Sequence, residues 1–318
     1  MKKIVALAFA LLLAPAAMAQ GYPSKPVRVI VNFPPGGSVD ILGRSIAQRL
    51  AEVLGQPFVV ENRAGASGNI GAEVVAKSPA DGYTILMSNG ATLVTNPHLY
   101  KATPFDSIRD FTQITQVARI FSMLVVHPTF PAQTAGEFLA YVRANPGKVT
   151  FGSAGNGSGP HITAELMNRM ANVSTVHVPY KGMQPAINDL LASQTNFMFA
   201  DGGAYPHVQA GKLRLLAVAS ATRMRILPDT PTLAEAGVPG FQYDSAHTLS
   251  VPAGTPKDIV ARLNAEVTKI LRGAELTERI RGMVAEPIAN SAEEATAATR
   301  SDFERTGKLL RDMSIRAD

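Results

Sequence analysis

The stretch FPPGGSVD, residues 33–40, joins a strand pattern to a helix pattern, and the rest of the chain is organised around it. The β-branched run VRVIVNF (residues 27–33) leads into it, and the helical pattern ILGRSIAQRLAEVLG (residues 41–55) follows it. Gly36 and Gly37 let the backbone approach a bound group closely, while the two prolines stiffen the exit from the strand. The first amides of the helix lack partners within it and lie at the positive end of its dipole. The sequence therefore predicts a site that holds a carboxylate, sulfate or phosphate with backbone amides.

A second stretch, GSAGNGSG at residues 152–159, repeats this arrangement. Residues 148–151 have a strand pattern, and residues 160–170 have a helix pattern. Pro160 suits the first position of that helix, and Ser158 or Gly159 is the expected cap. We expect the two strand–glycine loop–helix units to hold one anion from opposite sides.

Residues 1–19 have the pattern of a secretory signal peptide. Lys2 and Lys3 give a basic start, an apolar run follows, and the small-x-small site AMA precedes Gln20. The apolar run is too short to span a bilayer, so a retained anchor helix is the weaker alternative. We expect the mature chain to begin at Gln20 in the periplasm, and the absence of cysteine predicts that it has no lipid anchor and no disulfide.

The composition bounds the class of protein. The formal net charge is +5, with no block of like charges and no tryptophan, which argues against binding of nucleic acid. A chain of 318 residues can bury a sizeable core, and we expect two lobes and a monomer.

Strand and helix patterns alternate along the first third of the chain, which indicates βαβ units and a parallel sheet. Residues 110–127 are extended in character, and we interpret them as the passage into a second lobe; residues 244–252 are interpreted as the return. The predicted fold is α/β, with two lobes joined by two crossing strands that act as a hinge. The predicted first lobe contains residues 20–121 and 245–318, and the predicted second lobe contains residues 122–244.

The remaining elements follow from periodicity and capping patterns. We expect capping boxes at Thr134 with Glu137, Thr255 with Asp258, and Ser291 with Glu294. The C-terminal helices are expected to pack back on the first lobe. Further strands are predicted at residues 58–62, 83–88, 173–178, 197–200 and 213–220, and further helices at residues 69–77, 183–192, 256–271 and 274–281.

Motifs for catalysis and for cofactors are missing from the sequence. Ser67, Ser153 and Ser158 each lack a glycine that a nucleophile elbow needs, and no glycine loop ends in Gly-Lys-Ser/Thr. His161 and Glu165 are one helical turn apart, but no third metal ligand is near them in sequence. We therefore expect no catalytic residue, no cofactor and no metal.

Several polar residues allow both a binding and a structural interpretation. Asp40 can contact a ligand or stabilise the first turn of its helix. Ser38 and Ser158 can donate to a ligand or cap a helix. Asp201 ends a buried strand, Tyr180 follows a strand end, and His247 lies on the returning strand.

Six segments resemble the Bug family of periplasmic solute-binding proteins, also called the TctC type, which are the receptors of tripartite tricarboxylate transporters. They occur in the family's order over nearly the whole mature length: FPPGGSVDILGR, SPADGYTILM, GSAGNGSGPHITAELM, VPYKGMQPAINDLLA, LPDTPTLAEAGVPGF and VPAGTPKDIVARLN. The resemblance implies a two-lobed type II (Venus flytrap) binding-protein fold that grips a carboxylate with backbone amides.

The resemblance also implies which residues form the site. His247 stands where relatives commonly have tryptophan, which changes the far wall of the pocket. The far end of the pocket would be shaped by the loops around Asn89 and Asp201. The wall from the first lobe would be Phe33, Gly36, Gly37, Ser38 and Asp40, and the wall from the second lobe would be Ser153, Ala154, Gly157 and Ser158.

The function expected on this basis is capture of a small organic carboxylate and its delivery to membrane transporter subunits. A receptor that senses the same ligand for a signalling kinase is an alternative. A periplasmic hydrolase is a weaker one, because the sequence shows no pair of nucleophile and base. The residues leave open whether the ligand is a di- or tricarboxylate, an amino acid, or an aromatic or heterocyclic acid.

Overall fold

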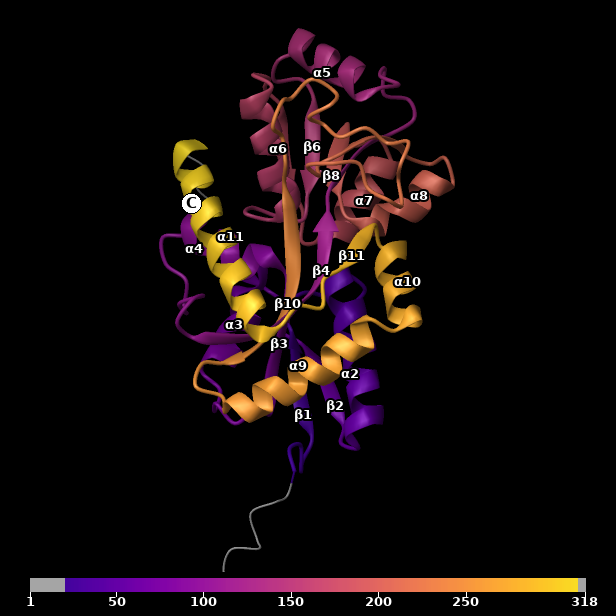
Figure 1. The fold of residues 1–318 in the computed structure, drawn as a ribbon. Coiled ribbons are helices and arrows are strands. Elements are labelled where there is room, and N and C mark those ends of the chain that lie inside the picture. Colours follow the sequence, from indigo (N-terminus) through magenta and orange to yellow (C-terminus); the bar gives the residue numbers. More distant parts are fainter. Residues whose placement is uncertain (1–20, 314–318) are drawn as a thin grey trace, which may run out of the picture.

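The computed structural model describes residues 21–313, so the expected signal peptide lies outside the described residues. Two lobes are each built on one β-sheet that is flanked by helices (Figure 1). In lobe one the sheet has the strand order β11-β4-β10-β3-β1-β2, and β1 is parallel to both β2 and β3. Its strands are β1 (Val27–Val31), β2 (Phe58–Asn62), β3 (Thr84–Ser88), β4 (Phe111–Phe121), β10 (Asp244–Pro252) and β11 (Ala285–Pro287).

The sheet of lobe two has the strand order β7-β6-β8-β5-β9. Strand β6 is parallel to β7 and β8, whereas β5 runs antiparallel to β8 and β9. Its strands are β5 (Met123–Val126), β6 (Thr150–Ser153), β7 (Val176–Pro179), β8 (Phe197–Ala200) and β9 (Arg214–Val218).

Strands β4 and β10 cross between the lobes as an antiparallel pair. The pairing runs from Phe121 opposite Asp244 to Phe111 opposite Pro252. Asp244 also forms an ion pair with Arg119 across the two strands, at 2.6 Å. The single extended passage expected over residues 110–127 is divided at Ser122, where the chain leaves one sheet and enters the other. The predicted α/β, two-lobed fold of type II binding proteins is confirmed.

The longer helices cover the sheets with an apolar stripe. In α2 (Ser38–Leu54), buried Leu42, Ile46 and Leu50 pack on the core of lobe one, and Gly55 ends the helix in a left-handed conformation. The other helices of lobe one are α3 (Asn69–Ala76), α4 (Asn96–Leu99), α9 (Lys257–Leu271), α10 (Ala274–Gly282) and α11 (Ala292–Met313), with the short turns η1 (Ala66–Gly68) and η2 (Ala91–Thr95). Lobe two has α5 (Ala135–Ala144), α6 (Gly159–Met170), α7 (Met183–Leu191), α8 (Tyr205–Gln209) and η3 (Gly202–Ala204).

Two of the three expected capping boxes are present. The hydroxyl of Thr134 accepts the amide of Glu137 at 3.2 Å, and the hydroxyl of Ser291 accepts the amide of Glu294 at 3.1 Å. The third prediction is wrong, because Thr255 donates its hydroxyl to the Pro252 carbonyl and closes a turn. Helix α9 begins one residue later than expected, at Lys257, after an extended Pro256.

The last helix contacts both lobes, which the sequence did not indicate. Helix α11 runs upward beside β10 towards α6 (Figure 1). It is fixed to lobe one where Gly307 lies against the ring of His98. Its buried Leu310 packs with Leu99 of lobe one and Ile162 of lobe two. Helix α11 is therefore a third connection between the lobes, beside β4 and β10.

Within residues 21–313, no helix combines the length and the apolar character needed to cross a bilayer.

Candidate functional site

The carboxyl ends of the parallel strands of the two sheets face each other. Ser38, which follows β1, contacts Asp201, which follows β8, with 3.5 Å between Oγ and Oδ2. Ser67, which follows β2, donates its hydroxyl to the carbonyl of Asn156, which follows β6, at 3.0 Å. Ligands of open α/β sheets bind at such strand ends. We call the loops after β1, β2, β3, β6, β7 and β8 the interlobe site.

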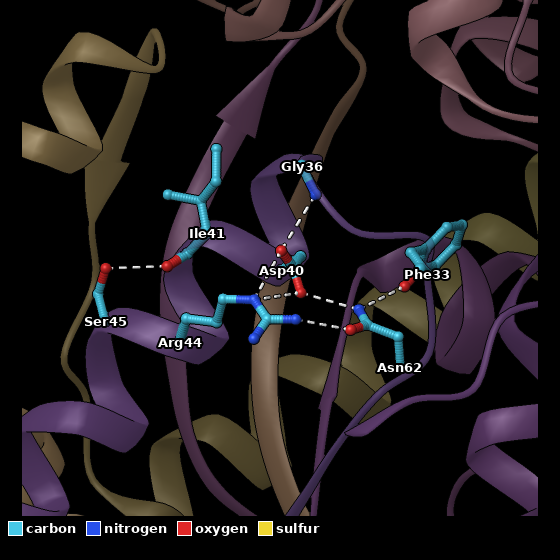
Figure 2. A network of polar contacts seen from close by, with 7 residues as sticks. All are labelled: Phe33, Gly36, Asp40, Ile41, Arg44, Ser45 and Asn62. Atoms are coloured by element: carbon cyan, nitrogen blue, oxygen red, sulfur yellow. Dashed lines mark hydrogen bonds and ion pairs between the residues drawn. The ribbon is translucent and has the colours of Figure 1, made fainter. Parts of the chain in front are cut away.

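Asp40 organises the glycine turn of lobe one (Figure 2). Its carboxylate accepts hydrogen bonds from the Gly36 amide at 3.0 Å, the Arg44 Nε at 3.0 Å and the Asn62 Nδ2 at 2.8 Å. The same Nδ2 donates to the carbonyl of Phe33 at 3.0 Å, so that the network joins both ends of the turn. Burial acts to raise the pKa of Asp40, but these hydrogen bonds outweigh it and hold that pKa below its ordinary value.

This network decides which groups of the turn remain available to a ligand. The side chain of Asp40 and the amide of Gly36 are engaged with each other, and the ring of Phe33 packs over the turn at Gly68. Gly37 occupies the N-cap of α2 and has no side chain that could accept the first helical amides. The amides at the start of α2 therefore have no side-chain acceptor from the cap residue, and helix N-termini of this kind are suited to bind anions.

Ser38 and His247 meet Asp201 in one polar cluster. The Ser38 Oγ lies 2.9 Å from the His247 Nε2 and 3.5 Å from the Asp201 Oδ2. Burial lowers the pKa of His247 to about 3, so its imidazole is neutral at physiological pH. This is no catalytic triad, because the acid contacts the serine and leaves the other imidazole nitrogen without support. Such a weak base would not activate a nucleophile near neutral pH.

The serines of the lobe-two loop bond within that loop. The Ser153 Oγ accepts the Gly155 amide at 3.1 Å, and Ser158 donates its hydroxyl to the Gly155 carbonyl at 2.7 Å. Ser158 occupies the N-cap of α6, yet its side chain does not cap the helix. Ala154 is half-buried between them. The loop therefore presents backbone, and not hydroxyls, to the interlobe site.

The stacked imidazoles of His161 and His177 contact the loop at residues 152–159. The rings of His161 and His177 lie 4.1 Å apart, and the ring of Phe151 lies 4.8 Å from that of His177. The His161 Nδ1 accepts the Gly157 amide at 3.1 Å, and the His177 Nε2 lies 2.6 Å from the Ser153 Oγ. Burial lowers the pKa of both imidazoles to about 4. Neutral imidazoles thus hold the loop in shape.

The stacked histidines predict a loss of stability in acid. Each is neutral in the folded chain until the pH nears about 4, whereas the unfolded chain binds a proton below the ordinary value of 6.5. Between pH 6.5 and about 4 the unfolded state therefore binds more protons than the folded state. The contribution of the two histidines to the free energy of unfolding falls as the pH drops through this range. We expect His161→Gln to flatten the decline in the free energy of unfolding, measured with urea from about pH 7 to about pH 4.5.

The control is His207→Gln, which changes a histidine of the same lobe outside the stack. Its free energy of unfolding should fall with decreasing pH as steeply as that of the unsubstituted protein. If the free energy of unfolding of His161→Gln changed with pH as steeply as that of the unsubstituted protein, this interpretation of the stacked histidines would be contradicted.

Two further candidates use their side chains inside their own lobes. Tyr180 donates its hydroxyl to the Asp189 Oδ2 at 2.7 Å, and burial followed by this contact raises its pKa to about 12. The Asn89 Oδ1 accepts a hydrogen bond from the Thr92 amide at 3.2 Å, at the start of η2. Both residues lie at strand ends of the interlobe site, but these contacts turn their polar atoms towards helices.

One loop of the interlobe site was missed from the sequence. Gly65, Ala66, Ser67 and Gly68 have four successive positive φ angles, of 131°, 47°, 52° and 90°. Such strain persists only where surrounding contacts impose it, and it is frequent at functional sites. Here Thr92 and Asn96 hold the Ser67 carbonyl, at 3.0 and 2.9 Å. The available signal was the spacing of the glycines in GASG directly after a strand.

The described residues show no group of three or more His, Cys, Asp or Glu side chains that could hold a metal ion. His161 and Glu165 have separate partners: the His161 Nδ1 accepts the Gly157 amide, and Glu165 lies near the side chain of Asn168.

The comparisons with known proteins agree on one family. The model of the tripartite tricarboxylate transporter family receptor matches residues 42–315. BugT of Bordetella pertussis is 33% identical over 299 residues, which are 92% of this chain and 91% of that protein. The structure of R. palustris Rpa4515 with adipate is 36% identical, with a TM-score of 0.89, and covers 93% of this chain and 99% of that one.

MatC (Rpa3494) from Rhodopseudomonas palustris with bound malate is 30% identical, with a TM-score of 0.84 over 91% of this chain and 100% of that one. The chain belongs to the tripartite tricarboxylate transporter family of receptors, the Bug or TctC type of periplasmic solute-binding protein.

Proposed function

We propose that the protein captures a small organic carboxylate between its lobes, in the periplasm, and delivers it as a monomer to a tripartite transporter. The observation that carries this proposal is a pair of glycine-rich turns from opposite lobes. Each leads from the carboxyl end of a strand into the N-terminus of a helix, α2 or α6, that no side chain caps. Contacts between Ser38 and Asp201 and between Ser67 and Asn156 bring the two turns to the same interface.

The chemistry of these turns suits a carboxylate. Helix N-termini offer amide donors and a positive partial charge, which together bind anions. In lobe two, Gly155 and Gly157 have φ angles of +121° and +75°, which a side chain would strain. Asp40 in lobe one, and His161 with Ser153 in lobe two, hold the turns in shape before a ligand arrives. Such preorganisation lowers the cost of binding.

The similar structures support the same class of ligand. Rpa4515 was solved with adipate, and MatC was solved with malate, and both compounds are dicarboxylates. Adipate and malate are the ligands of Rpa4515 and MatC, respectively. For this chain they support a carboxylate as the group that the two turns hold.

The test is a thermal-shift screen of the protein without residues 1–19 against carboxylates, each paired with its amide and its alcohol. A ligand at a hundred times its dissociation constant should add about 2.7 kcal/mol to the free energy of unfolding. We expect the stabilising compounds to be carboxylates, while their amides and alcohols leave the melting temperature unchanged. Equal stabilisation by the neutral partners, or none by any carboxylate, would overturn the proposed function.

A further inference from the structure

Two side chains of lobe one contact the glycine turn of lobe two. Ser67, in the loop after β2, donates its hydroxyl to the carbonyl of Asn156 at 3.0 Å. Tyr100, directly after α4, donates its hydroxyl to the Ser67 Oγ at 3.1 Å, and its oxygen lies 3.5 Å from the same carbonyl. Asn156 stands between Gly155 and Gly157, so it belongs to the turn that leads into α6. A chain of hydrogen bonds therefore joins the two lobes at that turn.

The backbone of lobe two also comes close to lobe one beside these hydrogen bonds. Gly157 has a φ angle of +75°, and a Cβ atom added there would lie 3.0 Å from the Leu99 Cδ1 and 3.7 Å from the Tyr100 Cε2. Leu99 packs in addition on Ile162 of α6. The turn thus lies against the end of α4, and a motion that separates the lobes at this place breaks the hydrogen bonds of Ser67 and Tyr100 to Asn156.

The loop that carries Ser67 has a costly backbone conformation. Ser67 has a φ angle of +52° and Ala66 one of +47°, a region that residues other than glycine rarely adopt. Hydrogen bonds from Thr92 and Asn96 hold the Ser67 carbonyl inside lobe one, while the Ser67 hydroxyl points to lobe two. Glycine would adopt this conformation without strain, but it has no hydroxyl. What serine adds at this position is the group that crosses to the other lobe.

We propose that Ser67 and Tyr100 form a latch that stabilises the closed arrangement of the lobes and so slows the escape of a bound ligand. The inference rests on the proposed function, in which the turn at Asn156 holds a carboxylate from lobe two. Both are positioning residues, because they act on that turn and through it on the lobes. When the lobes separate, the carbonyl of the exposed Asn156 bonds to water instead. The latch therefore shifts the balance between open and closed forms by the net value of neutral hydrogen bonds, about three- to tenfold.

The experiment follows lobe closure by Förster resonance energy transfer in the protein without residues 1–19. The chain has no cysteine, so two introduced cysteines can carry the donor and acceptor dyes. Gln48→Cys on α2 and Ala140→Cys on α5 place one dye on each lobe, at exposed positions. Adipate, malate and succinate are the probes. Stopped-flow mixing gives their association and dissociation rates, and the signal at equilibrium gives the separation of the lobes.

We expect Ser67→Ala to speed dissociation about three- to tenfold and to leave association unchanged, because the latch forms after the ligand has entered. Tyr100→Phe should act in the same direction. The factor should be the same for every probe that binds, since the latch acts on the lobes and not on the ligand. Unchanged dissociation in both variants would overturn the inference. A loss confined to association, or a factor that differs among the probes, would do so as well.

The substitution Ser67→Gly separates the latch from the stability of the loop. It removes the hydroxyl and relieves the positive φ, so its melting temperature without ligand should equal or exceed that of Ser67→Ala, while its dissociation should be as fast. A merely structural role of Ser67 predicts instead that the relaxed glycine variant retains its ligand like the unsubstituted protein. Ser193 is the matched control, because it is an exposed serine after α7 with a φ angle of +56°. Ser193→Ala and Ser193→Gly should leave dissociation unchanged.

Failure of the inference and failure of the proposed function give different results. If the probes bind and the Ser67 variants release them at the unsubstituted rate, the latch is wrong and the proposed function stands. If no carboxylate binds, here or in the thermal-shift screen, the proposed function fails. The ligand-free proteins then decide the latch: a greater lobe separation in Ser67→Ala supports it, and an equal separation overturns it.

Discussion

Replacing Gly202 with alanine is expected to keep the two lobes from closing and to weaken ligand binding about a hundredfold, which corresponds to about 2.7 kcal/mol. A Cβ atom added at Gly202 would lie 1.8 Å from the carbonyl oxygen of Met283 and 2.1 Å from its carbonyl carbon. These atoms are backbone, so they cannot swing aside as a flexible side chain would. Gly202 belongs to η3 of lobe two and Met283 follows α10 of lobe one, so separating the lobes relieves the clash.

Small-angle X-ray scattering and calorimetry measure this effect, with the carboxylate that gives the largest thermal shift as ligand. The Gly202→Ala variant should remain extended when that ligand is added, whereas the unsubstituted protein should become more compact. Gly136→Ala is the control, because a Cβ atom there meets its nearest neighbour at 4.0 Å. If Gly202→Ala bound the ligand with unchanged affinity, the closed contact between η3 and Met283 would not be the bound form.

The substitution Asp40→Asn should destabilise the fold by about 3 kcal/mol, because it breaks a buried, charge-assisted network. The carboxylate of Asp40 is 5% exposed and is surrounded by donors from Gly36, Arg44 and Asn62. An amide in its place turns an NH₂ group towards one of these donors. Urea denaturation near neutral pH measures the loss. Asp258→Asn, which changes an exposed acid in the first turn of α9, should cost less than about 1 kcal/mol.

The pH dependence gives this prediction a second readout. The pKa of Asp40 is held below its ordinary value of 3.8 in the folded chain, so its ionised form is stabilised by folding. That contribution is complete above the ordinary pKa and is lost as the pH falls through the lowered one. The difference in stability between Asp40→Asn and the unsubstituted protein should therefore shrink in strong acid. A difference that stayed constant with pH would show that shape, and not charge, holds the turn.

Regular elements of this fold could be predicted from the sequence because local patterns determine them. The strands at residues 58–62 and 197–200 were predicted with the bounds that the structure has, since β-branched or aromatic runs are bounded by turn residues. The two glycine turns were found in the same way. Strand β11 was missed, because a run of three residues shows no periodicity.

The partners of polar side chains could not be predicted from the sequence. Ser153 was expected in the wall of the site, and Ser158 was expected as a ligand donor or a helix cap. In the structure both hydroxyls bond within their loop, and Ser158 does not cap α6 with its side chain. The stacking of His161 on His177 depends on how α6 lies against β7, which no local pattern encodes. Asp201 and His247 were both proposed for the site, yet only the fold brings them to the same hydroxyl, that of Ser38.

Helix α11 couples the relative position of the two lobes to the surface near its C-terminal end. It is held against lobe one at His98, and its buried Leu310 rests on Ile162 of the other lobe. Any rotation about β4 and β10 must therefore change the packing at the end of this helix. If the lobes rotate when the proposed ligand binds, we expect the outer surface around Leu310 to change with them, far from the bound molecule.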